Sequence, residues 1–130
     1  MIKVTDIAFT AYPVTDIPRA RAFYGQTLGL KETMAEDFGN GMWWIEYEIG
    51  QGTLALTNYT KPAADRNGPN IALEVEDLDA AYAHIKAAGI EIPEIMPGTT
   101  IMESPVCRFF FIPDPDGNGI NIHQCKKPHN

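Results

Sequence analysis

The sequence predicts an α+β fold made of two tandem modules, each with the element order β-α-β-β-β. The first observation is an internal repeat, since Val14–Ile17 (VTDI) recurs as Val75–Leu78 (VEDL), with a helical pattern after each copy. The second is that the helical patterns end alike, at Leu28-Gly29-Leu30 and Ala88-Gly89-Ile90, where glycine is a helix-stop signal. The third is that runs typical of strands, separated by turn residues, follow each helix.

The first module begins with a strand over Val4–Tyr12 and continues with a helix. Asp16 is expected to cap this helix, because a short carboxylate accepts the free N–H groups of the first turn. Pro18 suits that turn, where its missing N–H costs little. A hairpin turn is expected at Gly50-Gln51, and it sets Glu46 opposite Ala55. The three strands after the helix are predicted at about Leu30–Met34, Met42–Ile49 and Thr53–Asn58.

The second module repeats this order from a strand over Asn70–Val75. Asp77 is its predicted helix cap, and Asp114–Asn118 (DPDGN) is a strong turn signal between its last two strands. Met96–Ser104 is predicted to be a loop. The strands after the helix are predicted at about Glu91–Ile95, Val106–Ile112 and Gly119–Gln124.

The chain of 130 residues suits one compact unit, or two small modules that share a core. We predict a single domain over residues 1–130. Module one covers about 1–60, a polar linker with two prolines covers about 61–69, and module two covers about 70–125.

Charge and composition restrict the partners of this chain. The net charge of −7 argues against a nucleic-acid-binding surface, which needs clustered lysine and arginine. Two cysteines are too few for a disulfide framework. No basic segment leads into an apolar run at the start, and no apolar run approaches the length of a membrane span, so a cytoplasmic location is predicted.

Four segments, in this order, resemble the vicinal-oxygen-chelate superfamily of glyoxalase, bleomycin-resistance and dioxygenase-like proteins. They are Asp16-Ile17-x-x-Ala20-x-x-Phe23-Tyr24, Leu28-Gly29-Leu30, Asn70-Ile71-Ala72-Leu73-x-Val75-x-Asp77-Leu78, and Asp114-Pro115-Asp116-Gly117-Asn118. The resemblance runs from about Ile7 to His123. It implies that the two βαβββ modules pair into a cupped mixed sheet. In the enzymes of this superfamily the cup holds a divalent metal, which chelates neighbouring oxygens of the substrate.

The resemblance also implies where metal ligands would stand, and this chain lacks them. The family's histidine on the first strand falls on Phe9, and its glutamate on the fourth strand falls on Ala55. The histidine on the fifth strand falls on Asn70, and the glutamate on the last strand falls on Asn121. Phenylalanine and alanine cannot bind a metal, and asparagine is a weak neutral donor. We therefore predict no metal at these positions and no cofactor.

Several other residues share the predicted cup face by strand alternation. Trp44, Phe109 and Phe111 either line a ligand site with Phe9 or fill a closed core or module interface. Glu46 either points into the cup, as a candidate general acid or base, or lies at an edge in an ion pair. His123 either contacts a ligand or has a structural role. We expect His84 and His129 to be solvent-exposed, and Cys107 and Cys125 to be small apolar side chains rather than reactive thiols.

The leading hypothesis for function is metal-independent binding of a small aromatic or cationic molecule in the cup, by a homodimer as the family implies. The ligand-binding residues would be Phe9, Trp44, Glu46, Ala55, Asn70, Phe109, Phe111, Asn121 and His123. The alternative is a glyoxalase-like lyase or isomerase, or a dioxygenase, with a relocated metal or acid–base site that uses Glu46 and His123. A regulatory module is a third possibility. Whether the chain is an enzyme stays open, as does whether the modules pair within one chain or between two.

Overall fold

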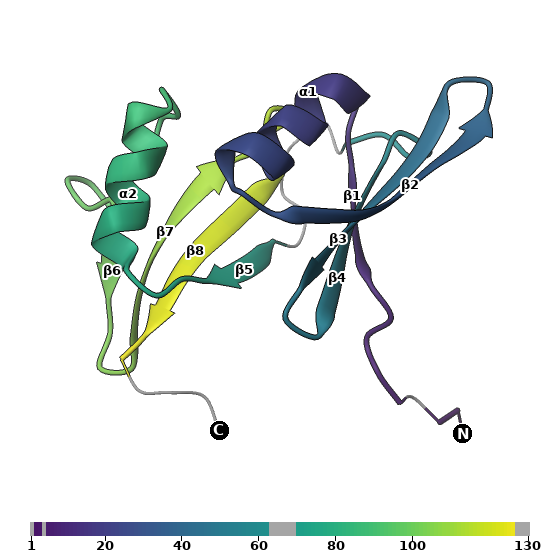
Figure 1. Cartoon of the computed structure of the whole chain (residues 1–130). Coiled ribbons are helices and arrows are strands. Elements are labelled where there is room, and N and C mark those ends of the chain that lie inside the picture. Colours follow the sequence, from purple (N-terminus) through teal and green to yellow (C-terminus); the bar gives the residue numbers. More distant parts are fainter. Residues whose placement is uncertain (1, 4, 63–69, 127–130) are drawn as a thin grey trace. The chain divides into compact units, whose positions relative to one another are not determined.

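The computed structural model describes residues 2, 3, 5–62 and 70–126 of the chain. The chain forms two compact units, Met1–Asp65 and Arg66–Asn130. Each unit contains one four-stranded mixed sheet and one helical segment (Figure 1). The predicted α+β class and the doubled β-α-β-β-β order are therefore confirmed. The predicted linker lies mostly outside the described residues, as does His129.

The first unit has a sheet with the strand order β1-β4-β3-β2, in which β1 is parallel to β4 and the other neighbours are antiparallel. The two-residue turn at Gly50-Gln51 pairs Ile49 with Gly52 and Glu46 with Ala55, as predicted. Gly50 has a φ of 59°, which glycine adopts without strain. The elements are β1 (Thr10–Pro13), α1 (Ile17–Arg21), η1 (Ala22–Thr27), β2 (Lys31–Gly39), β3 (Met42–Ile49) and β4 (Gly52–Thr57).

Helix α1 begins where the sequence predicts, because an Asp16 carboxylate oxygen accepts the backbone N–H of Arg19 at 2.9 Å. It continues into η1, a π-helical turn. The helical segment packs on its own sheet through aromatic rings, with the centroids of Tyr24 and Tyr47 6.0 Å apart. The buried apolar side chains of this unit include Ala20, Tyr24, Ile45, Tyr47, Leu54 and Leu56.

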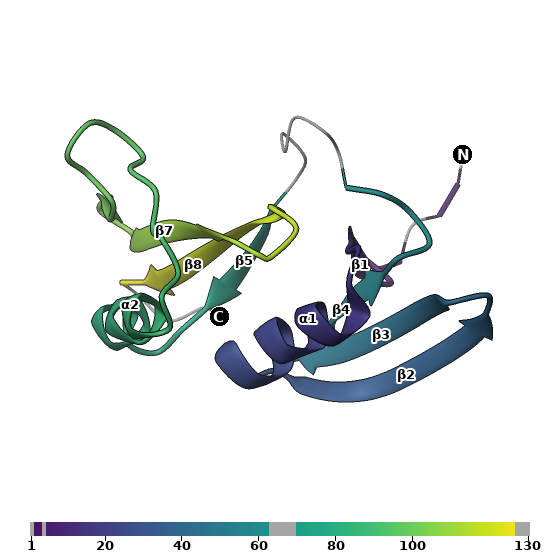
Figure 2. The same cartoon turned by 90° about the horizontal axis from the view of Figure 1, so that it is seen from above.

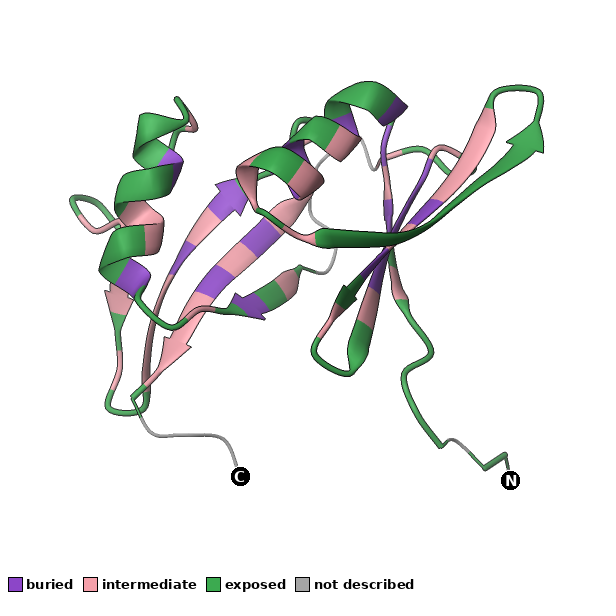
Figure 3. Cartoon of the chain, in the orientation of Figure 1, coloured by how far each residue is buried: buried purple, intermediate pink, exposed green. Residues whose placement is uncertain are grey.

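The second unit repeats the topology with the strand order β5-β8-β7-β6, and β5 is parallel to β8. Its helix lies against one face of this sheet, where the rings of Tyr82 and Phe110 make an edge-to-face contact at 5.2 Å (Figures 1 and 2). Buried residues alternate with half-buried ones along β7 and β8 (Figure 3). The elements are β5 (Ile71–Glu74), α2 (Leu78–Ala87), β6 (Met102–Glu103), β7 (Cys107–Pro113) and β8 (Gly119–Cys125).

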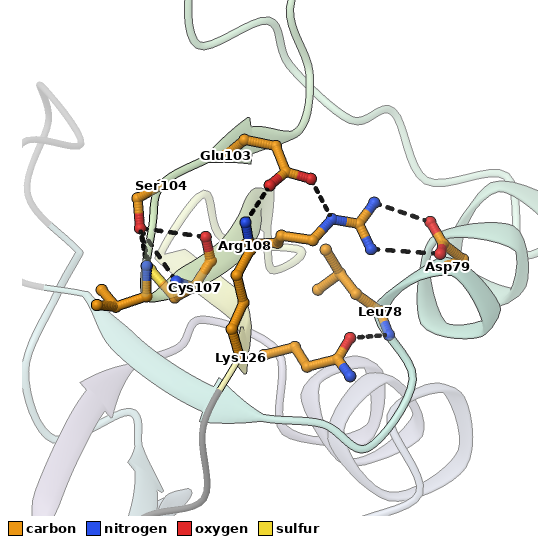
Figure 4. A network of polar contacts seen from close by, with 9 residues as sticks. Leu78, Asp79, Glu103, Ser104, Cys107, Arg108 and Lys126 are labelled. Atoms are coloured by element: carbon orange, nitrogen blue, oxygen red, sulfur yellow. Dashed lines mark hydrogen bonds and ion pairs between the residues drawn. The ribbon is translucent and has the colours of Figure 1, made fainter.

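Polar contacts fix both the start of α2 and the edge of its sheet. An Asp77 carboxylate oxygen accepts the N–H of Ala80 at 3.0 Å, which confirms the predicted cap. The Gln124 side-chain oxygen from β8 accepts the N–H of Leu78 at 2.9 Å. Arg108 on β7 forms ion pairs with Asp79 on α2 and with Glu103 on β6 (Figure 4). These contacts lower the pKa of the Asp79 carboxyl, mainly through its hydrogen bonds with Arg108.

Three predicted strands differ from the structure for physical reasons. The strand predicted at Val4–Tyr12 begins only at Thr10, where pairing with β4 starts. Strand β2 extends to Gly39, well past the predicted end at Met34, because it pairs with β3 through two register shifts. No strand forms at Glu91–Ile95, where Pro93 cannot donate to a ladder.

The short strand β6 lies instead within Met96–Ser104, which was predicted to be a loop. The sequence therefore misplaced the strand that follows α2. In the described part of the chain, no helix is both long and apolar enough to cross a bilayer.

Candidate functional site

Each sheet has one face covered by its helix and a second face, called here the helix-free face, that holds the candidate residues. In the first unit this face carries Trp44 and Glu46 of β3, which pair with Thr57 and Ala55 of β4. The indole N–H of Trp44 donates to a Glu46 carboxylate oxygen at 2.6 Å. Phe9 precedes β1, and its ring meets that of Trp44 edge-to-face with centroids 5.1 Å apart. The indole is thereby held on one side by a carboxylate and on another by a ring.

The helix-free face of the second unit is built by three strands in fixed register. Phe109 and Phe111 of β7 lie opposite His123 and Asn121 of β8, so all four share this face as predicted. The Phe109 ring stacks against the His123 imidazole at a centroid distance of 6.2 Å. It also meets the Phe111 ring edge-to-face at 5.6 Å. The four side chains are half-buried rather than sealed in a core.

His123 is oriented by a residue that sequence reasoning did not single out. Glu74 of β5 pairs with His123 in the parallel register, and one of its carboxylate oxygens lies 2.7 Å from the imidazole Nδ1. The other carboxylate oxygen accepts the backbone N–H of Cys125 at 2.7 Å. Alternation along β5 puts Glu74 on the same face as Ala72. The pairing of Glu74 with His123, however, depends on the register between two distant strands.

Two further features mark this face. The side-chain oxygen of Asn121 is buried and has no hydrogen-bond partner among the described residues, which is costly unless a ligand or water satisfies it. Phe111, the strand partner of Asn121, also lines an open cavity of about 310 Å³. The other lining residues are Glu91, Pro93, Ile112, Pro113 and Gly119. The buried acceptor and the cavity are therefore linked only through Phe111, which faces Asn121 across the strand pair.

The cysteines are half-buried and are not bonded to each other. Burial raises the pKa of the Cys125 thiol, and the nearby Glu74 carboxylate raises it further. This thiol therefore stays protonated at neutral pH, in agreement with the prediction that it is not a reactive nucleophile. His84 is exposed on α2, also as predicted.

Comparisons with known proteins identify the family to which this fold belongs. The family model described as Glyoxalase/Bleomycin resistance protein/Dioxygenase superfamily matches residues 6–122. The chain belongs to this superfamily. A search of curated proteins finds no match.

Among solved structures, the chain is similar to TnmS3, an antibiotic binding protein from Streptomyces sp. CB03234. The two share 21% identity over 97% of this chain and 100% of that one, with a TM-score of 0.75. The chain also resembles the fosfomycin resistance protein FosX from Mesorhizobium loti, with 18% identity, coverage of 93% and 92%, and a TM-score of 0.70. Lactoylglutathione lyase from Agrobacterium tumefaciens gives 19% identity, coverage of 93% and 94%, and a TM-score of 0.68. At these identities the likeness shows the fold alone.

The side chains at the four positions where the resemblance predicts metal ligands do not fit a catalytic divalent ion. The Phe9 ring packs on Trp44, and Ala55 is fully buried with no donor atom. Asn70 is exposed before β5, and Asn121 offers one neutral oxygen. Neutral amides alone are weak ligands for such a metal. The alternative pairing of Glu46 with His123 involves both units and stays a prediction.

Proposed function

We propose that this protein binds a small aromatic or cationic molecule on its helix-free faces, without a metal at the four positions described above. The observation that carries the proposal is the side-chain set of these faces. A phenylalanine, an alanine and two asparagines stand where the resemblance predicts metal ligands, and aromatic rings and a carboxylate lie near them on the same faces. Such a set binds by stacking and hydrogen bonding rather than by chelation.

The helix-free faces of the two units offer different chemistry. In the second unit, Phe109 and Phe111 offer apolar ring surface, and the Asn121 oxygen can accept an N–H or O–H from a ligand. In the first unit, Trp44 offers the strongest cation–π surface of any side chain, and Glu46 supplies a negative charge next to it. A planar molecule therefore suits the face of the second unit, and an amine suits the face of the first. The similarity to an antibiotic binding protein supports the binding of a small molecule.

Ligand screening in the presence of EDTA tests the proposal. We would titrate planar aromatic compounds, with and without an amine, into the full chain and follow tryptophan fluorescence and thermal stability, since a native-state ligand raises the latter. For a compound that binds, we expect Asn121→Ala to weaken affinity about 10-fold, the effect of one lost hydrogen bond. Phe109→Ala should weaken it by a similar factor.

Tyr59→Ala is the matched control, since Tyr59 is a strongly exposed aromatic side chain outside both faces. It should leave affinity unchanged. Binding that disappears in EDTA and returns with a divalent metal would overturn the proposal. It would favour a metal-dependent enzyme of the superfamily instead.

A further inference from the structure

Three different metal-binding groups converge at the Cys125 end of the second unit's helix-free face. Ligand atoms of Glu74, His123 and Cys125 all lie within 4.8 Å of one another. We propose that these residues, completed by Cys107, bind one Zn²⁺-class cation at a site separate from the four positions of the superfamily's metal. The inference does not depend on the proposed ligand binding.

The strand register holds the three groups together. Glu74 and His123 are partners in the parallel pairing of β5 with β8, and Cys125 follows on the same face of β8. A zinc ion with bonds of about 2.0–2.3 Å keeps its tetrahedral ligands roughly 3.3–3.8 Å apart, which lies within the observed spread. The 2.7 Å contact between Glu74 and His123 must open by less than about 1 Å to admit the ion.

Glu74 has the support expected of a metal-binding carboxylate. One of its oxygens contacts the imidazole, while the other is held by the backbone N–H of Cys125 at 2.7 Å. Such an outer contact fixes the orientation of a metal-binding carboxylate. At the ring's face, Phe109 stacks on His123 and limits rotation of the imidazole.

Cys107 lies directly across from Cys125 in the antiparallel pairing of β7 with β8. The backbone N–H and carbonyl of Cys107 both bond to Ser104 (Figure 4). The N–H of the adjacent Lys126 donates to the Val106 carbonyl. The two cysteines are therefore a non-hydrogen-bonded pair, the arrangement in which facing side chains come closest. The Cys107 thiol now contacts the Ser104 hydroxyl at 3.3 Å. A change of side-chain rotamer would turn it toward the site as the fourth ligand.

The ligand types indicate the class of ion. Two thiolates and an imidazole favour zinc and similar transition metals, whereas magnesium and calcium prefer sites made only of oxygen. With only one carboxylate, the site would bind calcium weakly.

Binding of Co²⁺, a spectroscopic substitute for Zn²⁺, tests the site on the full chain kept reduced and freed of metal. We expect one Co²⁺ per chain, with a thiolate-to-metal charge-transfer band that an equimolar amount of Zn²⁺ abolishes. His123→Ala and Cys125→Ser should weaken affinity at least about 10-fold to 100-fold, since even outer-shell changes cost that much. Cys107→Ser should reduce the band by about half, because one of two thiolates is lost.

His84→Ala is the control, since His84 is exposed on α2 and should leave binding unchanged. Glu74→Gln keeps the shape of Glu74 and tests its charge, and circular dichroism of each metal-free variant checks that it folds. Absence of a thiolate band, or equal affinity in the wild type, His123→Ala and Cys125→Ser, would overturn the site. Ligand binding measured in EDTA would be unaffected by either result, so the two proposals can fail separately.

Discussion

The two units share a topology but differ in the chemistry of equivalent positions. In each, the first strand lies parallel to the last, with Ala11 opposite Ala55 and Ala72 opposite Asn121. Ala55 and Asn121 are therefore equivalent, and so are their partners on the neighbouring strands, Glu46 of β3 and Phe111 of β7. The same register makes Trp44 equivalent to Phe109. On the covered face they match Ile45 with Phe110 and Tyr47 with Ile112. Equivalent positions therefore hold apolar or aromatic residues on the side facing the helix, and chemically different side chains on the other side.

The comparison teaches which part of the sequence specifies the fold. Positions under the helix keep only a requirement for apolar volume, which both units meet with different residues. Positions on the helix-free face carry no such requirement, and there the first unit places a carboxylate where the second places a ring. Functional divergence between the halves is therefore concentrated on one face of each sheet.

The largest expected effect is a loss of stability that distinguishes the two faces of one strand, β7. Phe110 is fully buried against Tyr82, whereas its neighbour Phe109 is half-buried on the helix-free face. Phe110→Ala should cost about 3–5 kcal/mol of unfolding free energy, because it leaves a cavity in the core. Phe109→Ala should cost less than half as much. Urea denaturation of both variants measures the difference.

Ile45→Ala extends this test to the equivalent buried position of the first unit, and it should also cost about 2–5 kcal/mol. If Phe109→Ala proved as destabilising as Phe110→Ala, the helix-free face would be part of the core. The distinction between the two faces would then be lost.

The sequence predicted what local rules control. Asp16 and Asp77 cap their helices because capping involves only residues three positions apart. Glu46 lies opposite Ala55 because a two-residue turn fixes the register of its hairpin. At Glu91–Ile95 the apolar pattern favours a strand, but Pro93 cannot donate to a ladder and no strand forms.

The candidate site was harder to predict because it depends on distant pairing. The shared face of His123, Phe109 and Phe111 follows from alternation once β7 and β8 are in register. The contact of Glu74 with His123 requires the parallel register of β5 with β8, which no turn specifies. Long-range registers of this kind are set by packing of the whole sheet, so the cluster with Cys125 was missed.

A second prediction uses Tyr47, which the second unit replaces with Ile112. Burial, reinforced by nearby Glu32, raises the pKa of Tyr47 to about 12. The unfolded chain loses this proton near pH 10, so the folded state is penalised as pH rises. The stabilisation that comes from the protonated Tyr47 phenol is complete below pH 10. It declines between about pH 10 and 12, by about 2–3 kcal/mol in all.

Tyr47→Phe should remove this part of the alkaline loss while leaving stability at pH 7 nearly unchanged, since the Tyr47 hydroxyl has no hydrogen-bond partner among the described residues. Denaturation midpoints from pH 8 to pH 11 measure it. The control is Tyr59→Phe, which changes an exposed ring. Parallel pH profiles for the wild type and Tyr47→Phe would show that this phenol does not titrate with unfolding.

The smallest expected effect compares the two helix starts. Asp16→Ala and Asp77→Ala should each cost about 1 kcal/mol, because each removes one capping bond to a backbone N–H. Helix α2 has a second capping contact, from Gln124 to the N–H of Leu78. In α1, Pro18 lies in the first turn and has no N–H that needs a partner. Gln124→Ala should therefore add about 1 kcal/mol to the loss in Asp77→Ala.

Asparagine variants distinguish hydrogen bonding from charge. Asp16→Asn and Asp77→Asn retain a side-chain oxygen for the cap but lose the charge near the helix start, so they should recover most of the stability. Thermal denaturation of the single and double variants measures these steps. Equal losses for alanine and asparagine would attribute the effect to the charge at the helix start rather than to the cap. Because the two helices differ in length and in their second contacts, a common result in both would show that the repeated Asp contributes equally to the start of each.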